Sequence, residues 1–194
     1  MLQYFENIKK SRHVLQMLVV RDVFSKYRKS FLGVAWSMIT PLSMVGVIGL
    51  VYSIVFGIPL IAFVPYLFSG LTPWLFISGA IDSGTSSYIA AEGFITQTKI
   101  HTEIFPLRMV LVAFVNYLFM SIAFFIVYAL IKPDAFNFNM LLYIPSSIII
   151  FIFCWGVANI VALINLYIRD YAYLQSILLQ ILFYITPLIY SPEL

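Results

Sequence analysis

Side chains that could do chemistry are few and scattered along this sequence of 194 residues. The two histidines, His13 and His101, lie far apart, so their spacing indicates no metal site. Asp82, Glu92 and Glu103 are too dispersed to act as a cluster of catalytic carboxylates. The sequence also has no G-x-x-x-x-G-K-[ST] loop to cradle nucleotide phosphates, so we do not expect this chain to be an ATPase itself.

Basic residues are densest in the segment RDVFSKYRK, residues 21–29. At helical spacing one face carries the apolar side chains, namely Val20, Val23, Phe24, Tyr27 and Phe31. The opposite face carries Arg21, Asp22, Lys26, Arg28 and Lys29. The pattern predicts an amphipathic helix whose basic face meets the anionic inner surface of a membrane. Two interpretations follow: a simple anchor, or a platform for a cytoplasmic partner.

Long apolar runs make up most of the remaining chain. Hydrophobic residues account for 62% of the sequence and charged residues for 10%, against about 25% in soluble domains. A bilayer core about 30 Å thick takes a helix of about 20 apolar residues. The runs are continuous and do not alternate as membrane strands do, so they predict helices and an all-α, polytopic fold.

We predict five spans, with a turn at Gly57, Pro59 and Pro65, which break helices. The spans lie near residues 34–56, 66–90, 107–130, 142–166 and 171–189. Residues 1–30 then form a cytoplasmic amphipathic helix at the interface, and residues 31–194 form a transmembrane domain.

The cationic residues predict the orientation. With the N-terminus in the cytoplasm, every Lys and Arg except Lys132 lies on the cytoplasmic side of a plasma membrane. The net charge of +3 is therefore a signal of topology and requires no nucleic-acid partner. Cys154 falls inside a predicted span, which leaves no disulfide framework or cysteine metal site. No cleavable signal peptide is expected.

The opening segment also resembles the start of type-2 ATP-binding-cassette export permeases, which export polysaccharides and polyol phosphates. The matching residues are Arg21-Asp22, Lys26-Tyr27-Arg28, Ser30, Leu32-Gly33, Trp36 and Pro41-Leu42. Two later stretches agree with the same family. They contain Gly93-Phe94-Ile95 and Phe105-Pro106-Leu107, and then Arg169-Asp170, Thr186-Pro187 and Ser191-Pro192-Glu193.

The resemblance implies that two copies of the chain form a pore and that two separate ATPase subunits bind beneath it, holding ATP and Mg. It implies that residues 92–105 dock in the ATPase, with the basic helix beside them. The expected coupling residues are Glu92, Lys99, His101 and Glu103, which can form charge-assisted hydrogen bonds. Family members continue through a sixth span, so the resemblance also implies a chain truncated at its C-terminus.

The implied substrate is a lipid-linked glycan, for example O-antigen, capsule or teichoic acid. Sugars have flat apolar faces and hydroxyl edges, which aromatic rings match. The family lines its pore with the first and fifth spans, whose aromatic residues here are Trp36, Tyr52, Phe56, Phe183, Tyr184 and Tyr190. Membrane aromatics also form interfacial belts and packing contacts, and Trp36 and Tyr190 at span ends suit a belt.

Two other classes of membrane protein would show different sequence patterns. A membrane-embedded glycosyl- or acyltransferase acting on a lipid-linked substrate would show clustered Asp, Glu or His at the membrane surface, and the acids here are scattered. An ion-coupled carrier would show ionisable residues near mid-membrane or inverted repeats, and the sequence shows neither. A transport subunit is therefore the favoured function.

Overall fold

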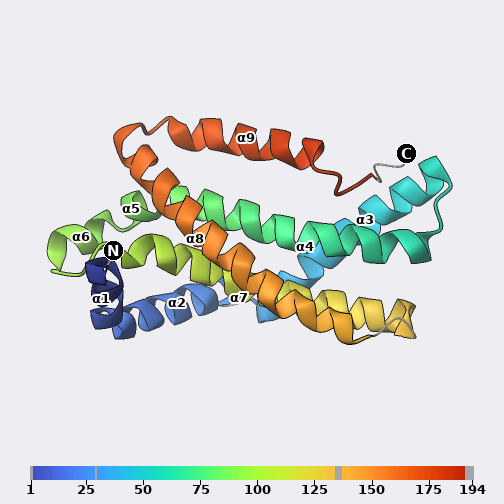
Figure 1. Cartoon of the computed structure of the whole chain (residues 1–194), viewed down its shortest axis with the longest axis horizontal. Coiled ribbons are helices and arrows are strands. Elements are labelled where there is room, and N and C mark those ends of the chain that lie inside the picture. Colours follow the sequence, from blue (N-terminus) through green and yellow to red (C-terminus); the bar gives the residue numbers. More distant parts are fainter. Residues whose placement is uncertain (1, 29, 134–136, 191–194) are drawn as a thin grey trace.

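The computed structural model describes residues 2–28, 30–133 and 137–190, without the side chains of Leu2, Lys26 and Tyr27. Its described residues form helices and connections, with no strand, so the predicted all-α class is confirmed (Figure 1). The α-helices are α1 (Leu2–Lys10), α2 (Arg12–Tyr27), α3 (Trp36–Phe56), α4 (Leu60–Thr85), α5 (Ser87–Ala90), α6 (Glu92–Gln97), α7 (Ile104–Ile131), α8 (Tyr143–Tyr167) and α9 (Tyr171–Ile185). Short 3₁₀ helices, Gly33–Ala35 and Phe138–Leu142, lead into α3 and α8.

Four helices are long and apolar enough to cross a membrane: α3 and α8 with their 3₁₀ turns, α4 and α7. The fifth predicted span, α9, is a shorter apolar helix that ends at Ile185. Its end has a local cause. Thr186 precedes Pro187, and a residue before proline is pushed out of the helical region, as the extended ψ of 128° at Thr186 shows.

The second span differs from its prediction at both ends. Gly57, in the left-handed region at φ 67°, and Pro59 separate α3 from α4, as expected. Pro65, however, lies buried inside α4, so the prediction that it breaks the helix is wrong. Proline removes one backbone hydrogen bond, and membrane helices tolerate that loss where neighbouring groups compensate. At the other end α4 stops at Thr85, and the chain continues in the short helix α5.

Helix α4 is the centre of the bundle and packs against α3, α7, α8 and α9. Toward its start, Phe63, Phe68 and Leu71 form a core with Phe124 of α7. Toward its end, it approaches α8 closely, since a Cβ on Gly84 would lie 2.7 Å from the Cβ of Ala158. Small residues at such crossings let membrane helices pack backbone to backbone.

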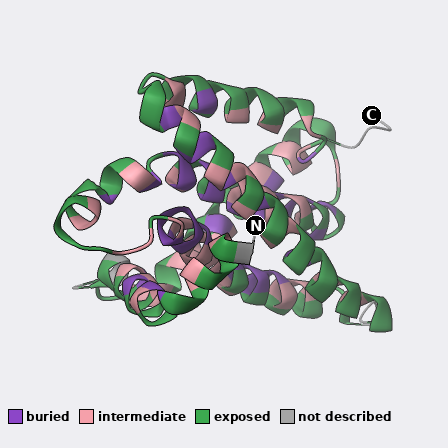
Figure 2. Cartoon of the chain, turned by 60° about the vertical axis from the view of Figure 1, so that its left-hand side comes forward, coloured by how far each residue is buried: buried purple, intermediate pink, exposed green. Residues whose placement is uncertain are grey.

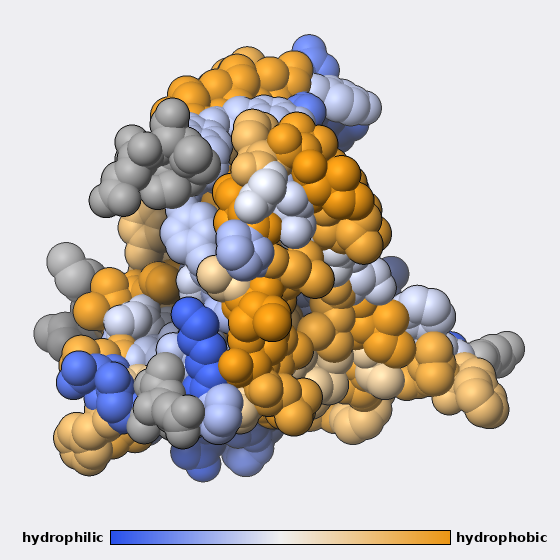
Figure 3. Space-filling view, turned by 90° about the vertical axis from the view of Figure 1, so that its right-hand side faces the viewer, coloured by the Kyte–Doolittle hydropathy of each residue, from blue (hydrophilic) through white to orange (hydrophobic). Residues whose placement is uncertain are grey.

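The outward faces of the long helices are apolar. Exposed side chains include Ile54 of α3, Leu130 of α7 and Ile149 of α8, each more than half accessible. Buried residues lie on the inner faces of the helices, where these pack against one another (Figure 2), and apolar surface covers much of the end that carries the α3–α4 turn (Figure 3). Such a surface fits lipid, and the chain has the build of a multi-pass membrane protein.

Most of the described Lys and Arg residues lie at one end of the bundle. Helices α1, α5 and α6, the start of α7 and the α8–α9 turn share that end, and α2 runs along the first turns of α7 (Figure 1). We call this the basic end; its described cations are Lys9, Lys10, Arg12, Arg21, Arg28, Lys99, Arg108 and Arg169. Lys132 follows α7 at the opposite end. The charge segregation behind the orientation is therefore present in the fold.

Candidate functional site

The N-terminal region forms two helices that pack onto the segment between α4 and α7. The sequence predicted one helix over residues 1–30; instead the buried Ser11 separates α1 from α2. Leu15 and Leu18 of α2 share a core cluster with Ile104 and Phe105 of α7, both fully buried. The basic helix thus lies beside the predicted docking segment, as expected, and the last part of that segment is inside the protein.

An ion pair fixes α2 on α7. Two guanidinium N–H groups of Arg108, Nε and Nη2, lie 2.6 Å and 2.5 Å from Asp22 Oδ2. The Arg108 side chain is only 8% exposed. The prediction that Asp22 belongs to the outer charged face of the helix is therefore wrong, because Leu15, Leu18 and Asp22 share the face that packs on α7.

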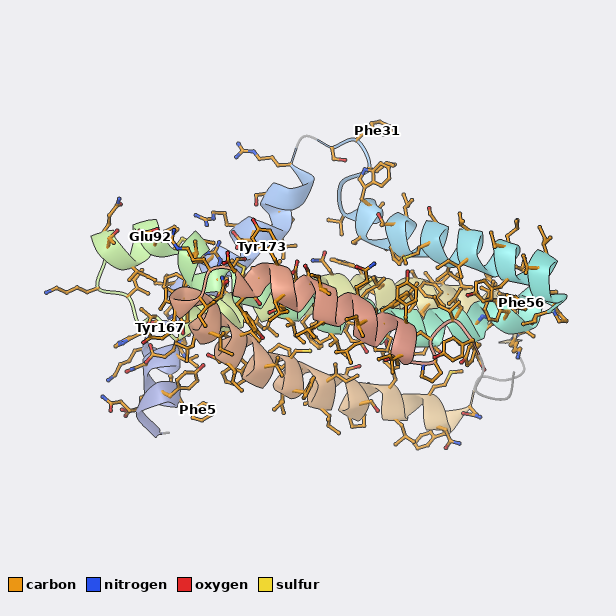
Figure 4. The ribbon with its side chains drawn as sticks, turned by 90° about the horizontal axis from the view of Figure 1, so that it is seen from above. Phe5, Phe31, Phe56, Glu92, Tyr167 and Tyr173 are labelled. Carbon is orange, nitrogen blue, oxygen red and sulfur yellow. The ribbon has the colours of Figure 1, made fainter. Side chains whose placement is uncertain are left out.

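The opposite face of α2 is apolar and exposed. Met17, Val20 and Phe24 are 69%, 54% and 65% accessible. Val23, predicted on the same face, is buried, and Phe31 follows the helix and points away from the bundle (Figure 4). The helix therefore has two apolar faces, one for α7 and one suited to a lipid surface.

Arg21 connects α2 to α6. Its guanidinium lies 5.5 Å from the centre of the Phe94 ring, in a cation–π contact. Phe94 belongs to the Gly93-Phe94-Ile95 element on which the family resemblance rests. Of the other residues predicted for the basic helix, Arg28 is exposed. Lys29 and the side chain of Lys26 lie outside the described part.

The four predicted coupling residues fall into two environments. Glu92, at the start of α6, is exposed (Figure 4), and the side chain of Lys99 is exposed too. His101 and Glu103 are half-buried, and Glu103 accepts a hydrogen bond from Asn7 Nδ2 at 2.9 Å. Partial burial raises the pKa of Glu103. The hydrogen bonds from Asn7 and from its own backbone, together with the nearby His101, lower this pKa by more than burial raises it. The net result is a pKa below the ordinary value.

Helix α1 is a contact element that sequence reasoning missed. Tyr4 donates a hydrogen bond to Asn159 Oδ1 at 3.0 Å, and its ring lies 6.1 Å from that of Trp155 in α8. Tyr4, Asn7 and Ile8 share one helix face through their i, i+3 and i+4 spacing. This spacing is the sequence signal from which the contact face could have been predicted. Through this face α1 joins α8 to the start of α7.

A second missed feature is a set of buried polar side chains between α4, α8 and α9. Asn165 Nδ2 donates to the Thr85 carbonyl oxygen at 3.0 Å, and the Thr85 hydroxyl contacts the Gln175 amide oxygen. Gln175 is the only buried residue of α9. The sequence signal for these contacts is an isolated polar residue within an apolar run, because membrane helices use such groups to bind one another.

The predicted pore aromatics form two groups beside α4. Tyr52 of α3 stacks on Phe63 at 5.6 Å and also contacts Phe56. In the second group Phe183 lies 5.8 Å from Trp74 and contacts Tyr184, whose carbonyl oxygen accepts a bond from Tyr190.

The two aromatic groups meet α4 on neighbouring turns. Tyr66 lies 6.1 Å from Phe63 and donates to the carbonyl oxygens of Pro187 and Tyr190. Trp36 is separate, at the other end of α3, where it lines a cavity of about 450 Å³ between α3, α4 and α7. The single chain therefore assembles five of the six aromatics at one end, and their pore role stays a prediction.

No family model matches the chain. It is 25% identical over 190 residues to the O-antigen export system permease protein RfbA of Myxococcus xanthus, covering 98% of this chain and 73% of that protein. Two RfbA permeases of Klebsiella pneumoniae are 24% and 26% identical, over 94% of this chain and 71% of each relative. The resemblance to type-2 ATP-binding-cassette export permeases is thereby confirmed: over nearly its whole length this chain is similar to permeases of O-antigen export systems.

Proposed function

We propose that this chain is the transmembrane permease subunit of an ATP-driven exporter that moves a lipid-linked polysaccharide or related glycan across the plasma membrane. The observation that carries the proposal is the extent of the similarity, which covers 98% of the chain and so includes both the basic end and the apolar helices. The relatives are named for O-antigen export, which supports a glycan carried on a lipid as the substrate.

Energy enters from a separate ATPase subunit, which binds ATP and Mg, at the basic end. Exposed Glu92 and Lys99 on and after α6 are available to it. Movement of α6 reaches the bundle by two routes. One passes through Phe94 and Arg21 to α2, and the other through the buried start of α7.

Two copies of the chain enclose the path of the glycan. Helices α3 and α9 present the exposed aromatic rings Trp36, Phe56 and Tyr184, which suit the apolar faces of sugars. Helix α9 suits a lining role because Gln175 is its single buried residue, so most of its surface is left for a second copy or for the substrate.

Co-expression with a candidate ATPase subunit tests this function. The tagged chain should retain the ATPase through purification in detergent, and inverted membrane vesicles containing both should take up a lipid-linked glycan only with ATP. An ATPase variant that cannot hydrolyse ATP is the control. Glycosyl or acyl transfer by the purified chain alone would contradict the proposal and favour the membrane-embedded transferase.

The coupling residues give a sharper arm of the same test. Glu92→Gln with Lys99→Gln should weaken ATPase retention about tenfold or more, because each removes a group able to form charge-assisted hydrogen bonds. Lys132→Gln, at the opposite end, is the matched control and should leave retention unchanged. Equal retention in all three proteins would place the ATPase contact elsewhere.

A further inference from the structure

The turn from α2 into α3 encloses a pocket of about 520 Å³, which we call the elbow pocket. It is lined by Arg21, Phe24, Ser25, Arg28, Gly33 and Val34. Arg21, Phe24 and Ser25 share one face of α2 through their i, i+3 and i+4 spacing, and Arg28 follows as the C-cap of the helix. Gly33 closes the turn at φ 50°, in the left-handed region that favours glycine. The pocket is thus built by the helix face and by the geometry of the turn.

The elbow pocket carries uncompensated positive charge. Asp22 is engaged by Arg108 at 2.5 Å, while its contact with Arg21 is 3.4 Å, longer than the 2.7–2.9 Å of a charge-assisted bond. Among the described residues no carboxylate forms an ion pair with Arg28, and none lines the pocket. The charges of Arg21 and Arg28 are therefore left to attract an anion.

The surroundings select the kind of anion. The apolar span that contains α3 begins at Gly33, and Phe24 in the pocket lining is exposed. A site between an apolar span and exposed arginines lies where lipid head groups meet hydrocarbon. Guanidinium groups match phosphate oxygens, and Phe24 and Val34 offer apolar contact to the carbon atoms that adjoin a lipid phosphate.

We propose that the elbow pocket binds the phosphate of an anionic membrane lipid. This is a discrete site, in contrast to a general attraction between a basic helix and a charged surface. It rests on the membrane placement within the proposed function and on no other part of it. Because Arg21 also lies over Phe94 of α6, the same guanidinium links the bound phosphate to the coupling segment.

The test uses the full chain in nanodiscs of phosphatidylcholine with a minor fraction of phosphatidylglycerol, and counts retained lipids by native mass spectrometry. The chain should retain phosphatidylglycerol preferentially. Arg21→Gln with Arg28→Gln should weaken that retention about thirtyfold, given the attraction of each cation for anionic lipid. Arg21→Lys with Arg28→Lys keeps both charges and should restore most of it.

Lys10→Gln with Arg12→Gln is the matched control, because it removes the same charge from the exposed α1–α2 corner. This variant should retain phosphatidylglycerol as the unaltered chain does. Equal retention by the Arg21/Arg28 glutamine variant, or an equal loss in the corner variant, would overturn the proposal. A chain that fails to insert into nanodiscs would instead contradict the membrane placement itself.

A competition arm identifies the source of the phosphate. A polyprenyl phosphate added to the nanodiscs either displaces the retained phosphatidylglycerol or leaves it bound. Displacement supports a site for a polyprenyl carrier, and persistence supports a site for a glycerophospholipid. Loss of both lipids from the Arg21/Arg28 glutamine variant is expected in either case.

Discussion

At the scale of single residues, the ion pair Asp22–Arg108 has a large energetic consequence at the basic end. Removing one partner of a buried ion pair leaves an uncompensated charge and costs about 3–5 kcal/mol. The pair joins residues that are 86 positions apart, and so it holds α2 against α7. Arg21, adjacent in sequence, is 52% exposed and forms only a long contact with Asp22.

We therefore expect Asp22→Asn to lower the thermal unfolding temperature of the purified chain clearly, because Arg108 keeps its charge without a carboxylate. Arg21→Gln, the matched control, should change stability by less than about 1 kcal/mol, as exposed pairs do. Thermal unfolding in nanodiscs measures both. If the two variants unfolded at the same temperature, the pair would have no structural role.

The packing of α1 on the bundle should depend on pH through Glu103, which accepts a hydrogen bond from Asn7 of α1. Its folded pKa lies below the ordinary value, so its contribution to stability is present at neutral pH and is lost as pH falls through that folded pKa. The loss should therefore begin near the ordinary glutamate pKa of about 4.3 and be complete below the folded pKa. Hydrogen exchange of the α1 amides, corrected for intrinsic rates, should show falling protection in this range.

The partner of Glu103 provides the control for this pH effect. Asn7→Leu removes the hydrogen bond that lowers the pKa of Glu103 and leaves its partial burial, which raises it. The pH-dependent loss of α1 protection should then become smaller, because the folded and unfolded pKa values of Glu103 come closer together. An unchanged pH profile in this variant would show that another group governs the transition.

At the scale of elements, α9 is attached to the bundle near its two ends. Toward its start, Gln175 contacts Thr85, while Phe183 near its end packs against Trp74 and Leu188 beyond it packs over Gly70, 3.1 Å from where a Cβ would lie. Between these contacts most residues of the helix are exposed. An element held at its ends can shift with little repacking, which suits a helix that borders a path for substrate.

Gln175→Ala should loosen α9. Interhelical hydrogen bonds in membranes contribute about 1 kcal/mol, so amide protection in residues 171–185 should fall about fivefold. Gln180→Ala removes an exposed amide from the same helix and should leave protection unchanged. Equal protection in the two variants, measured by hydrogen exchange, would mean that the polar contact does not hold the helix.

The elements also show what the sequence alone determines. Helices α3, α7 and α8 lie close to their predicted spans, because a continuous apolar run of bilayer length has one stable form in lipid. Pro65 was misassigned because a proline inside a membrane helix has the same local signature as a turn. Asp22 was misplaced because α2 has two apolar faces, and only packing of Leu15 and Leu18 on α7 decides which faces inward.

At the scale of the whole molecule, the bundle has two unlike ends. The basic end gathers α1, α5, α6 and the docking segment, while the other end carries the α3–α4 turn and Lys132, which follows α7 (Figure 1). Cations gather on the cytoplasmic side of membrane proteins because they resist translocation. Under the proposed function, the same asymmetry would present α6 to an ATPase in the cytoplasm.

Two lysines at opposite ends test that orientation directly. With Cys154 replaced by Ser, Lys99→Cys and Lys132→Cys each supply one exposed thiol. A membrane-impermeant maleimide added to intact cells should label position 132 and spare position 99, and inverted vesicles should give the reverse. Labelling of position 99 from outside would invert the bundle, and α6 would then face away from any source of ATP.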